Sequence, residues 1–225
     1  MQTCDDVRPF AASIEGWLSD AQGCALFRAA AATTGKGLIV EIGSWQGRST
    51  AWLAAGARLA GARVYAIDPH TGSREDPDAA TYETFRANLT KIGVADVVEP
   101  LVTTSAEAAR LLEGPIELLF IDGDHSHDAV RLDAELWLPK LVEGGIVMFH
   151  DVGAAGYTGP RQVFRRSICW SSGFDRIERI GSMAMARRTR RRGFASAAWG
   201  WCAGLLLYLY DVKRVLRHVY PAFLR

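Results

Sequence analysis

The stretch VEIGSWQGRST, residues 40–50, decides the fold. It follows directly on Leu38 and Ile39, so a short, continuous, β-branched run leads into a turn that contains Gly43 and Gly47. After the turn, residues 48–59 have the composition of a helix. A buried strand, a glycine turn and a helix in this order predict the first unit of an α/β sheet.

A phosphate-binding loop is a poor match for this turn. Such a loop reads G-x-x-x-x-G-K-[ST], because its backbone N–H groups must surround the anion and its lysine must reach it. Here only three residues separate Gly43 from Gly47, and Arg48 occupies the lysine position. Glu41 also precedes the turn, and a carboxylate repels phosphate but attracts a cation or a ribose hydroxyl. The turn therefore indicates a ligand that carries ribose and positive charge.

The same alternation continues along the chain. Ser19 and Gln22 form a capping box that opens a helix ending near Gly35. Further strands are predicted at 64–67, 97–101, 118–121 and 145–149, and helices at 81–92, 105–112 and 128–138. Residues 174–180 and 182–186 read as an antiparallel hairpin around Gly181. Strands that alternate with helices predict a parallel, doubly wound sheet covered on both faces.

Polar side chains gather where these strands end. They are Glu41, Asp68, Asp122, His150 and Asp151. Ligands of open α/β sheets bind beyond the carboxyl ends of the strands, so these residues mark the predicted site.

Several motifs carry a family resemblance: VEIGSWQGRST, AIDPH, TTSAEAA, LLFIDGDHSHDAVRLDAELWLPKLVEGGIVMFHDV and, before the first strand, EGWLSDAQGCALF. The chain resembles the class I S-adenosylmethionine-dependent O-methyltransferases, and among them the small bacterial macrocin-type sugar and natural-product enzymes. The likeness covers about residues 15–187. It implies a Rossmann-like methyltransferase sheet at 37–188 that is mostly parallel and ends in an antiparallel hairpin. Residues 1–36 would form a helical cap, and 189–225 a basic, aromatic-rich helical tail.

The resemblance also implies a cofactor site. Its residues would be Glu41, Gly43, Ser44, Gly47, Ser49, Asp68, Ser105 and Asp122. Glycines let the backbone approach the methionyl part, and Asp68 can accept both ribose hydroxyls. Two alternatives stay open: Asp68 as a turn former before Pro69, and Ser105 as a plain helix N-cap.

A metal site follows if the strands that end at Asp122 and at His150-Asp151 are neighbours, as the resemblance implies. Two carboxylates and an imidazole suit a hard divalent cation, with Mg²⁺ as the first choice. Many relatives have an acid where this chain has His150. That difference leaves room for manganese or for a histidine that does not ligate.

The proton acceptor is expected after the fourth strand. Asp124 holds the position two residues after the metal aspartate, and His125 has a pKa suited to base catalysis. His127 is expected to brace the following helix. Tyr157, Arg161 and Arg165 either line the acceptor pocket or, as the preferred interpretation, form a solvated helix face.

The acceptor is expected to be a hydroxyl of a saccharide or polyhydroxylated small molecule, because adjacent hydroxyls can chelate the cation. One alternative is a nucleic-acid methyltransferase that uses the basic tail, although the acidic body would repel nucleic acid. Another is a non-catalytic, cofactor-binding protein at a membrane.

The C-terminal tail differs from the body in charge. Residues 187–225 hold nine of the 26 basic side chains and one of the 25 acidic ones. Residues 193–210 form an uncharged run of 18, too marginal to span a bilayer. Its aromatic residues favour a helix at a membrane surface. The stripe of Trp201, Leu205, Tyr208, Leu209, Val212 and Leu216 could instead pack on the body or a second subunit, and the small-residue motif of Gly200 and Gly204 would matter only in lipid.

Composition adds few constraints. With 49% hydrophobic and 23% charged residues, the chain is typical of a globular protein. The four cysteines have no regular spacing and predict neither a zinc site nor a disulfide framework. Cysteines without a disulfide framework favour a cytoplasmic location, and the absence of a basic, apolar leader agrees. Peripheral membrane contact through the tail is also expected. A homodimer is expected, and nucleic acid is not expected as a partner.

Overall fold

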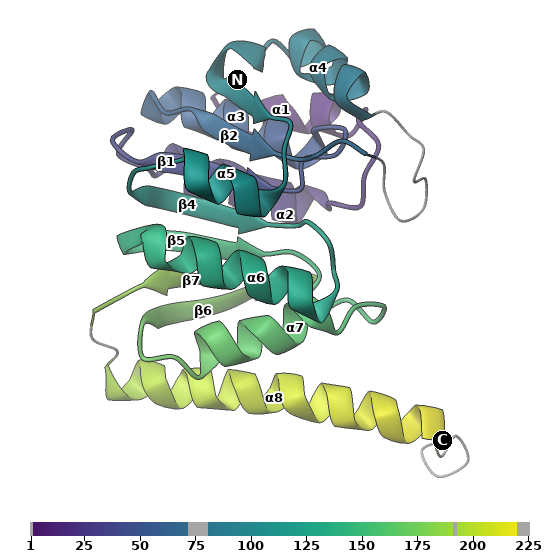
Figure 1. Cartoon of the computed structure of the whole chain (residues 1–225), viewed down its shortest axis with the longest axis vertical. Helices are drawn as coiled ribbons and strands as arrows, with labels where there is room; N and C mark the ends of the chain where they lie inside the picture. The colour runs from purple at the N-terminus through teal and green to yellow at the C-terminus, as the bar shows by residue number, and fades with distance from the viewer. Residues whose placement is uncertain (1, 72–80, 191–192, 220–225) are drawn as a thin grey trace.

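The computed structural model describes residues 2–71, 81–190 and 193–219, with side chains through Lys213. The described residues form one seven-stranded sheet in the order β3-β2-β1-β4-β5-β7-β6, with helices on both faces (Figure 1). Strands β1 to β5 pair in parallel, while β7 pairs antiparallel with β5 and β6. The predicted doubly wound, mostly parallel sheet with a terminal hairpin is confirmed.

The strands are β1 (Leu38–Ile42), β2 (Val64–Ile67), β3 (Val98–Leu101), β4 (Ile116–Ile121), β5 (Leu141–Phe149), β6 (Phe174–Ile180) and β7 (Met183–Arg188). The α-helices are α1 (Cys4–Ala11), α2 (Asp20–Ala31), α3 (Arg48–Ala60), α4 (Thr81–Ile92), α5 (Ser105–Leu111), α6 (His127–Trp137), α7 (Gly159–Phe164) and α8 (Phe194–Val219). Short helical turns are η1 (Ala95–Val97), η2 (Leu138–Lys140) and η3 (Arg165–Cys169), the last a π-helix.

Several strands run further than the sequence predicts, and the extensions of β1 and β5 bear on the site. β1 continues through Glu41 and Ile42, because both pair with β2 and β4. β5 begins at Leu141, which pairs with Ile116, and a register shift near Gly144 separates this start from the rest of the strand. Because glycines occupy positions 144 and 145, a search for β-branched runs does not detect that β5 begins at Leu141.

The core has two parts, one on each face of the sheet. Alternate residues of β1 point to opposite faces, so Ile39 joins the cluster beneath α1 to α4, and Val40 joins the cluster beneath α5 to α8. The clusters contain fully buried aromatic residues, Trp52 in the first and Trp137 in the second. Buried side chains thus pack against both faces of the sheet.

Helices α1 and α2 cover one end of this core and are joined by a disulfide. Cys4 and Cys24 are bonded, with their Cα atoms 5.3 Å apart. The sequence-based prediction of no disulfide was wrong here, since a pair separated by 20 residues has no spacing signature. Cys169 is buried and Cys202 is exposed, and neither belongs to a disulfide. Because disulfides are rare in a reducing cytosol, the Cys4–Cys24 bond gives no support to the predicted cytoplasmic location, which stays a prediction.

The C-terminal helix α8 lies along the β6 side of the sheet (Figure 1). Its inner stripe comprises Gly200, Gly204, Leu207 and Asp211, while Trp201, Leu205 and Leu209 are at least half exposed. Of the stripe proposed for packing, Trp201 and Tyr208 contact Trp170 and Arg165, whereas Leu205 and Leu209 face outward. Leu216 lies outside the described side chains. A Cβ on Gly204 would lie 2.3 Å from Trp170 Nε1, so this glycine matters without any lipid, contrary to the expectation.

Arg161 and Arg165 are buried rather than solvated, which corrects the preferred interpretation of this segment. Both form ion pairs with Asp211 of α8. The sequence gives no signal for this pairing, because Asp211 lies 50 residues after Arg161 and 46 residues after Arg165. Among the residues that the structure describes, none of the helices combines the length and apolarity needed to cross a membrane.

Candidate active site

The glycine turn between β1 and α3 brings the backbone of two strands together. Gly43 has φ +84°, and a Cβ there would lie 2.3 Å from the carbonyl oxygen of Asp122. Gly47 has φ +91° and begins α3 without a side-chain cap. The hydroxyl of Ser44 is buried and has no hydrogen-bond partner in the described part of the chain. The turn therefore packs its backbone closely against that of Asp122 and holds an unpaired polar group, the Ser44 hydroxyl.

Glu41 lies directly beneath this turn and is fully buried. Ser49 donates a hydrogen bond of 2.5 Å to Oε1, and Thr50 donates one of 2.6 Å to Oε2. Burial raises the pKa of Glu41 to about 8, although the two hydroxyls oppose the shift. Glu41 and Ser49 thus hold the first turn of α3 in place.

Asp68, at the end of β2, supports the turn from the neighbouring strand. Its Oδ2 accepts the backbone N–H groups of Ser44 and Trp45 at 3.0 and 2.8 Å. Its Oδ1 accepts the N–H of His70 at 2.7 Å. Both oxygens therefore hold the loops around the predicted ribose position. The contacts that Asp68 makes within the chain are those of a turn former, as the alternative interpretation expected.

Ser105 is the first residue of α5, but it does not cap the helix. The N-cap is Thr104, which forms a capping box with Glu107. The Ser105 hydroxyl instead accepts a hydrogen bond of 2.8 Å from Trp137 Nε1. This bond ties α5 to α6 beside the carboxyl edge of the sheet.

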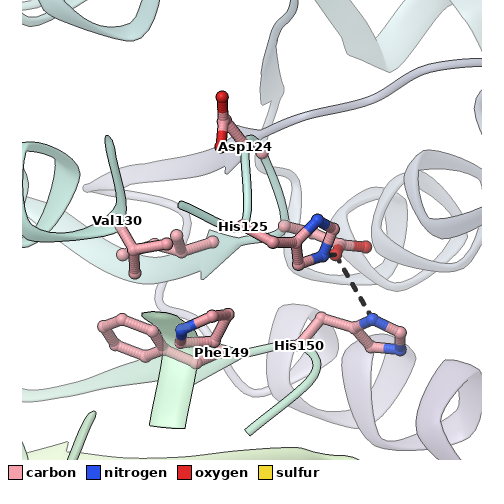
Figure 2. A pocket seen from close by; sticks show the side chains of 9 residues that line it. Asp124, His125, Val130, Phe149 and His150 are labelled. Atoms are coloured by element: carbon pink, nitrogen blue, oxygen red, sulfur yellow. Dashed lines mark ion pairs between the residues drawn. The ribbon is translucent and has the colours of Figure 1, made fainter. Parts of the chain in front are cut away.

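A small pocket lies where β4 and β5 end. Figure 2 shows its lining, which consists of Ile121, Asp122, Gly123, Asp124, His125, Val130, Phe149, His150 and Pro160. The Asp124 carboxylate points away from His125 and His150 in this view. It accepts the backbone N–H of Ser126 at 2.6 Å, at the start of α6. Of the two predicted bases, His125 faces the predicted metal acids.

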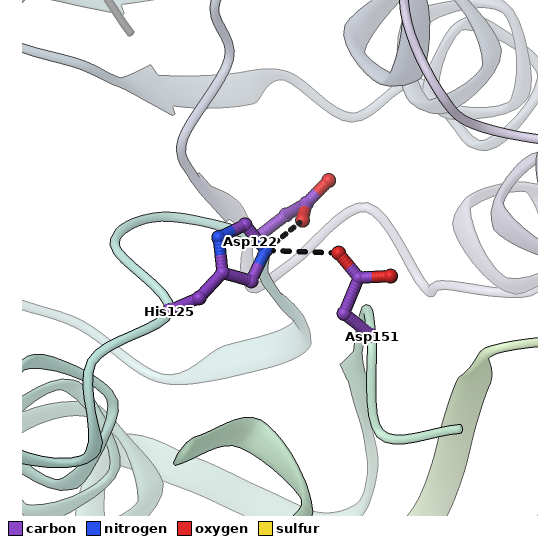
Figure 3. A group of neighbouring side chains, drawn as sticks. All are labelled: Asp122, His125 and Asp151. Atoms are coloured by element: carbon purple, nitrogen blue, oxygen red, sulfur yellow. Dashed lines mark ion pairs between the residues drawn. The ribbon is translucent and has the colours of Figure 1, made fainter. Parts of the chain in front are cut away.

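Asp122 and Asp151 meet at this point, because β4 and β5 are adjacent and end together. Figure 3 shows both carboxylates turned toward His125. One ligand atom from each of the three residues lies within 4.8 Å of the other two. His125 Nε2 is 2.9 Å from Asp151 Oδ2 and 3.7 Å from Asp122 Oδ1. These three side chains could share one metal ion.

His150 contacts the same two carboxylates from the more buried side of the group. Its Nδ1 lies 3.3 Å from Asp122 Oδ1 and 3.2 Å from Asp151 Oδ2. Its side chain is 5% exposed, against 28% for His125. The structure thus brings all three predicted metal ligands together and adds His125 to them.

The electrostatics of the group reflect this crowding. Burial by itself would lower the pKa of both histidines, but the two aspartates raise it to about 9 for His125 and about 10 for His150. Burial would raise the pKa of Asp151, yet hydrogen bonds and charge from the histidines lower it overall. The two aspartates thus favour the protonated form of both histidines.

Sequence reasoning underestimated Tyr157. Its ring stacks on that of His125, with centroids 4.1 Å apart. The loop after β5 carries no periodic signal, so only the fold could place this ring. His70 was also missed: it is buried, and its Nδ1 contacts Thr81 Oγ1 at 2.8 Å.

A family model described as a methyltransferase domain matches residues 40–152, which run from β1 to just past Asp151. This range includes the glycine turn, Asp68 and both aspartates. The chain belongs to this methyltransferase family.

Individual relatives agree with the assignment. This methyltransferase is 35% identical over 114 residues to a catechol O-methyltransferase of Mycobacterium tuberculosis. The match covers 50% of this chain and 46% of the relative, so the chain spans about half the length of the curated relative.

Solved structures share the fold. An O-methyltransferase from Bacillus cereus in complex with SAH is 20% identical, with a TM-score of 0.61 and coverage of 84% of this chain and 91% of that one. CalS11, a TDP-rhamnose 3'-O-methyltransferase of calicheamicin biosynthesis, is 16% identical, with a TM-score of 0.55 and coverage of 82% and 92%. At these identities the likeness concerns the Rossmann-like fold.

The donor set of this methyltransferase fits a divalent cation. Nδ1 of His150 and Nε2 of His125 both face the two carboxylates. Replacing the two imidazolium protons with one dication would leave the net charge of the group unchanged. Carboxylate oxygens with one imidazole are ligands that Mg²⁺ and Mn²⁺ accept.

Proposed function

We propose that this protein transfers a methyl group from S-adenosylmethionine to a hydroxyl of a polyhydroxylated small molecule. The observation that carries the proposal is the meeting of Asp122 and Asp151 beside the glycine turn. The turn would receive the methionyl part of the cofactor, with the unpaired Ser44 hydroxyl as one contact. Asp68 and Ser105 lie at neighbouring strand and helix ends, where the ribose and adenine would rest.

Asp122, Asp151 and His150 would hold a divalent cation, with Mg²⁺ the first choice. His150 suits a ligand because it is nearly buried behind the two carboxylates. When bound, the cation would lower the pKa of an acceptor hydroxyl and orient it. A set of Asp122, His125 and Asp151 is the alternative that the same geometry allows.

His125 is the proposed proton acceptor. It is the more exposed of the two histidines, and its stacking on Tyr157 fixes the plane of its ring. In the reaction, the hydroxyl oxygen forms a bond to the methyl carbon as the bond from that carbon to sulfur breaks. The sulfonium becomes a neutral thioether, and the hydroxyl proton passes to His125, which must first release its own proton to the solution as the cation binds.

The acceptor is proposed to carry adjacent hydroxyls, as in a glycoside or another diol. The two relatives whose names state an acceptor act on a catechol and on TDP-rhamnose, and both molecules offer neighbouring oxygens. A lipid-linked saccharide would fit the tail described below.

The test uses the full chain with labelled S-adenosylmethionine and a panel of catechols and nucleotide sugars, with Mg²⁺, with Mn²⁺ or with chelator. We expect label in a diol acceptor only when metal is present. Transfer that persists undiminished in chelator would refute the metal-dependent account. Mn²⁺ titrations of H150Q and H125Q then assign the ligand: the ligand variant loses affinity, and the base variant keeps it while losing turnover.

We further propose that the outer face of α8 contacts an anionic membrane. This face presents Phe194, Leu205, Leu206 and Leu209, with exposed fractions from 50% to 91%. It is flanked by Trp199, Trp201, Tyr208 and Tyr210, which are partly exposed but also contact the body. The tail is strongly basic, and its one acid, Asp211, is already paired with two arginines. Each basic residue near an anionic surface contributes about 1 kcal/mol.

Charge favours lipid over a second copy of the same face. Antiparallel pairing of two α8 helices would bring the basic start of one tail close to the basic end of the other. Such like charges repel each other across an interface. The expected homodimer is therefore proposed to use another face.

Vesicle sedimentation tests this contact, with neutral vesicles compared with vesicles that contain an anionic phospholipid. We expect binding to the anionic vesicles, and a loss of binding in L206E. L111E is the matched control, since Leu111 on α5 is 69% exposed but lies outside the tail. Equal loss in both variants, or no binding at all, would refute the proposal. An RNA titration over a salt series is expected to show no binding.

A further inference from the structure

Arg161 joins three segments of the chain through one guanidinium group. It lies on α7 and is fully buried. Its Nε donates to Asp211 Oδ1 of α8 at 2.6 Å. Its Nη1 donates to the backbone oxygens of Val152 and Ala154, at 3.2 and 3.0 Å. The ring of Tyr210 on α8 lies 4.8 Å from its Cζ.

Val152 and Ala154 belong to the loop that directly follows Asp151. Asp151 itself has φ +55°, a left-handed conformation that is uncommon for a residue other than glycine. Such a conformation persists only when the surroundings impose it. Arg161 holds this loop on one side, and Gly153 N–H bonds to Ser182 O at 2.8 Å on the other.

The clamp depends on the C-terminal helix. A buried guanidinium needs a counter-charge, and loss of the partner of a buried ion pair is strongly destabilising. Asp211 supplies that charge, and it lies on α8. Docking of the tail therefore stabilises the arginine that holds the loop of the site.

We propose that Arg161 is a positioning residue for Asp151, and that Asp211 of the tail holds Arg161 in place. The proposal rests on the proposed metal site, since it concerns the carboxylate that would hold the cation. The tail would then have a second role besides membrane contact, because Asp211 helps to position Asp151 at the carboxyl edge of the sheet.

Arg165 provides a matched control. It is also buried, and its Nη1 donates to the other oxygen of Asp211 at 3.1 Å. Its guanidinium lies over the rings of Trp170 and Tyr208, and its described hydrogen bond reaches α8 rather than the loop. A change at Arg165 should thus weaken tail packing while leaving the Asp151 loop clamped.

The experiment compares wild type, R161K and R165K as full chains. Lysine keeps the charge but has a single nitrogen, so it cannot bond Asp211 through one atom and the two carbonyls through another, as Nε and Nη1 do. Mn²⁺ affinity is measured by electron paramagnetic resonance, SAH affinity by calorimetry, and stability by urea unfolding. We expect R161K to lower Mn²⁺ affinity by about tenfold or more and to leave SAH affinity within about twofold. We expect R165K to keep the Mn²⁺ affinity of wild type, even where its stability falls as far as that of R161K.

Unchanged Mn²⁺ affinity in R161K would overturn the proposal and leave the metal site standing. Absence of Mn²⁺ binding in wild type would overturn the metal site and this proposal with it. If R161K does not fold, D211N replaces it: the same loss of Mn²⁺ affinity supports the proposal, and unchanged affinity contradicts it.

Discussion

Asp122 and Asp151, at the ends of adjacent parallel strands, present oxygen atoms within 4.8 Å of each other. His150 Nδ1 lies between 3.2 and 3.3 Å from an oxygen of each. The arrangement comes from sheet register, because Ile121 pairs with Phe149 and the two strands therefore end level. The account of this methyltransferase depends on that pair of carboxylates.

Binding of Mn²⁺ should weaken as pH falls. The aspartates raise the pKa of His125 to about 9 and of His150 to about 10, so both rings carry protons at pH 7. A ligand histidine must lose its proton to the solution when metal binds. We expect at least about one proton released per Mn²⁺ near pH 7.5, with affinity falling up to about tenfold per pH unit. Calorimetry in buffers of different ionisation enthalpy measures this number, and no proton release would contradict a histidine ligand.

Substitution of Gly43 should be far more damaging than substitution of another glycine with positive φ. G43A would place a Cβ 2.3 Å from Asp122 O, whereas the Cβ of G61A would meet nothing within 4 Å. The left-handed backbone alone costs about 1–2 kcal/mol at either position. We expect G43A to lose clearly more stability than G61A in urea unfolding, and to lose SAH binding. Equal losses would show that the close approach to Asp122 is unimportant.

Glu41 should make stability depend on pH. Because its folded-state pKa is raised to about 8, its contribution is complete below the unfolded pKa of about 4.3 and is lost as pH rises through 8. E41Q removes the titrating group but keeps a similar shape. We expect wild type to lose more stability than E41Q between pH 5 and 8.5. Parallel curves for the two proteins would contradict this assignment.

Gly204 should be a packing position for the tail. Alanine normally stabilises the interior of a helix by about 1 kcal/mol relative to glycine. At Gly204, however, its Cβ would lie 2.3 Å from Trp170 Nε1, while Gly193 has open space. We therefore expect G204A to lower the melting temperature and G193A to leave it nearly unchanged. A gain in stability from G204A would argue against the docked position of α8.

The sequence predicted the sheet well because local signals were consistent along the chain. The capping box of Ser19 and Gln22, the glycine turn and the hairpin at Gly181 are all local and are all present. The acids at strand ends could also be predicted, since strand order decides which ends meet. Their roles in binding and catalysis remain proposals.

Contacts between distant segments could not be predicted from the sequence. The Cys4–Cys24 bond, the stacking of Tyr157 on His125 and the Arg161–Asp211 ion pair each join residues with no common periodicity. Burial of Arg161 illustrates the reason. An arginine in a polar segment is usually solvated, and only the docking of α8 supplies the counter-charge that allows it to be buried.

The most direct measurement is Mn²⁺ titration of D122N, D151N and D128N, followed by methyl transfer at saturating metal. D128N is the control, because Asp128 has a side chain 88% exposed and lies on α6 outside the cluster. We expect D122N and D151N each to lose Mn²⁺ affinity by about tenfold or more and to lose turnover, while D128N behaves as wild type. Wild-type Mn²⁺ affinity and methyl transfer in both D122N and D151N would contradict the shared cation site.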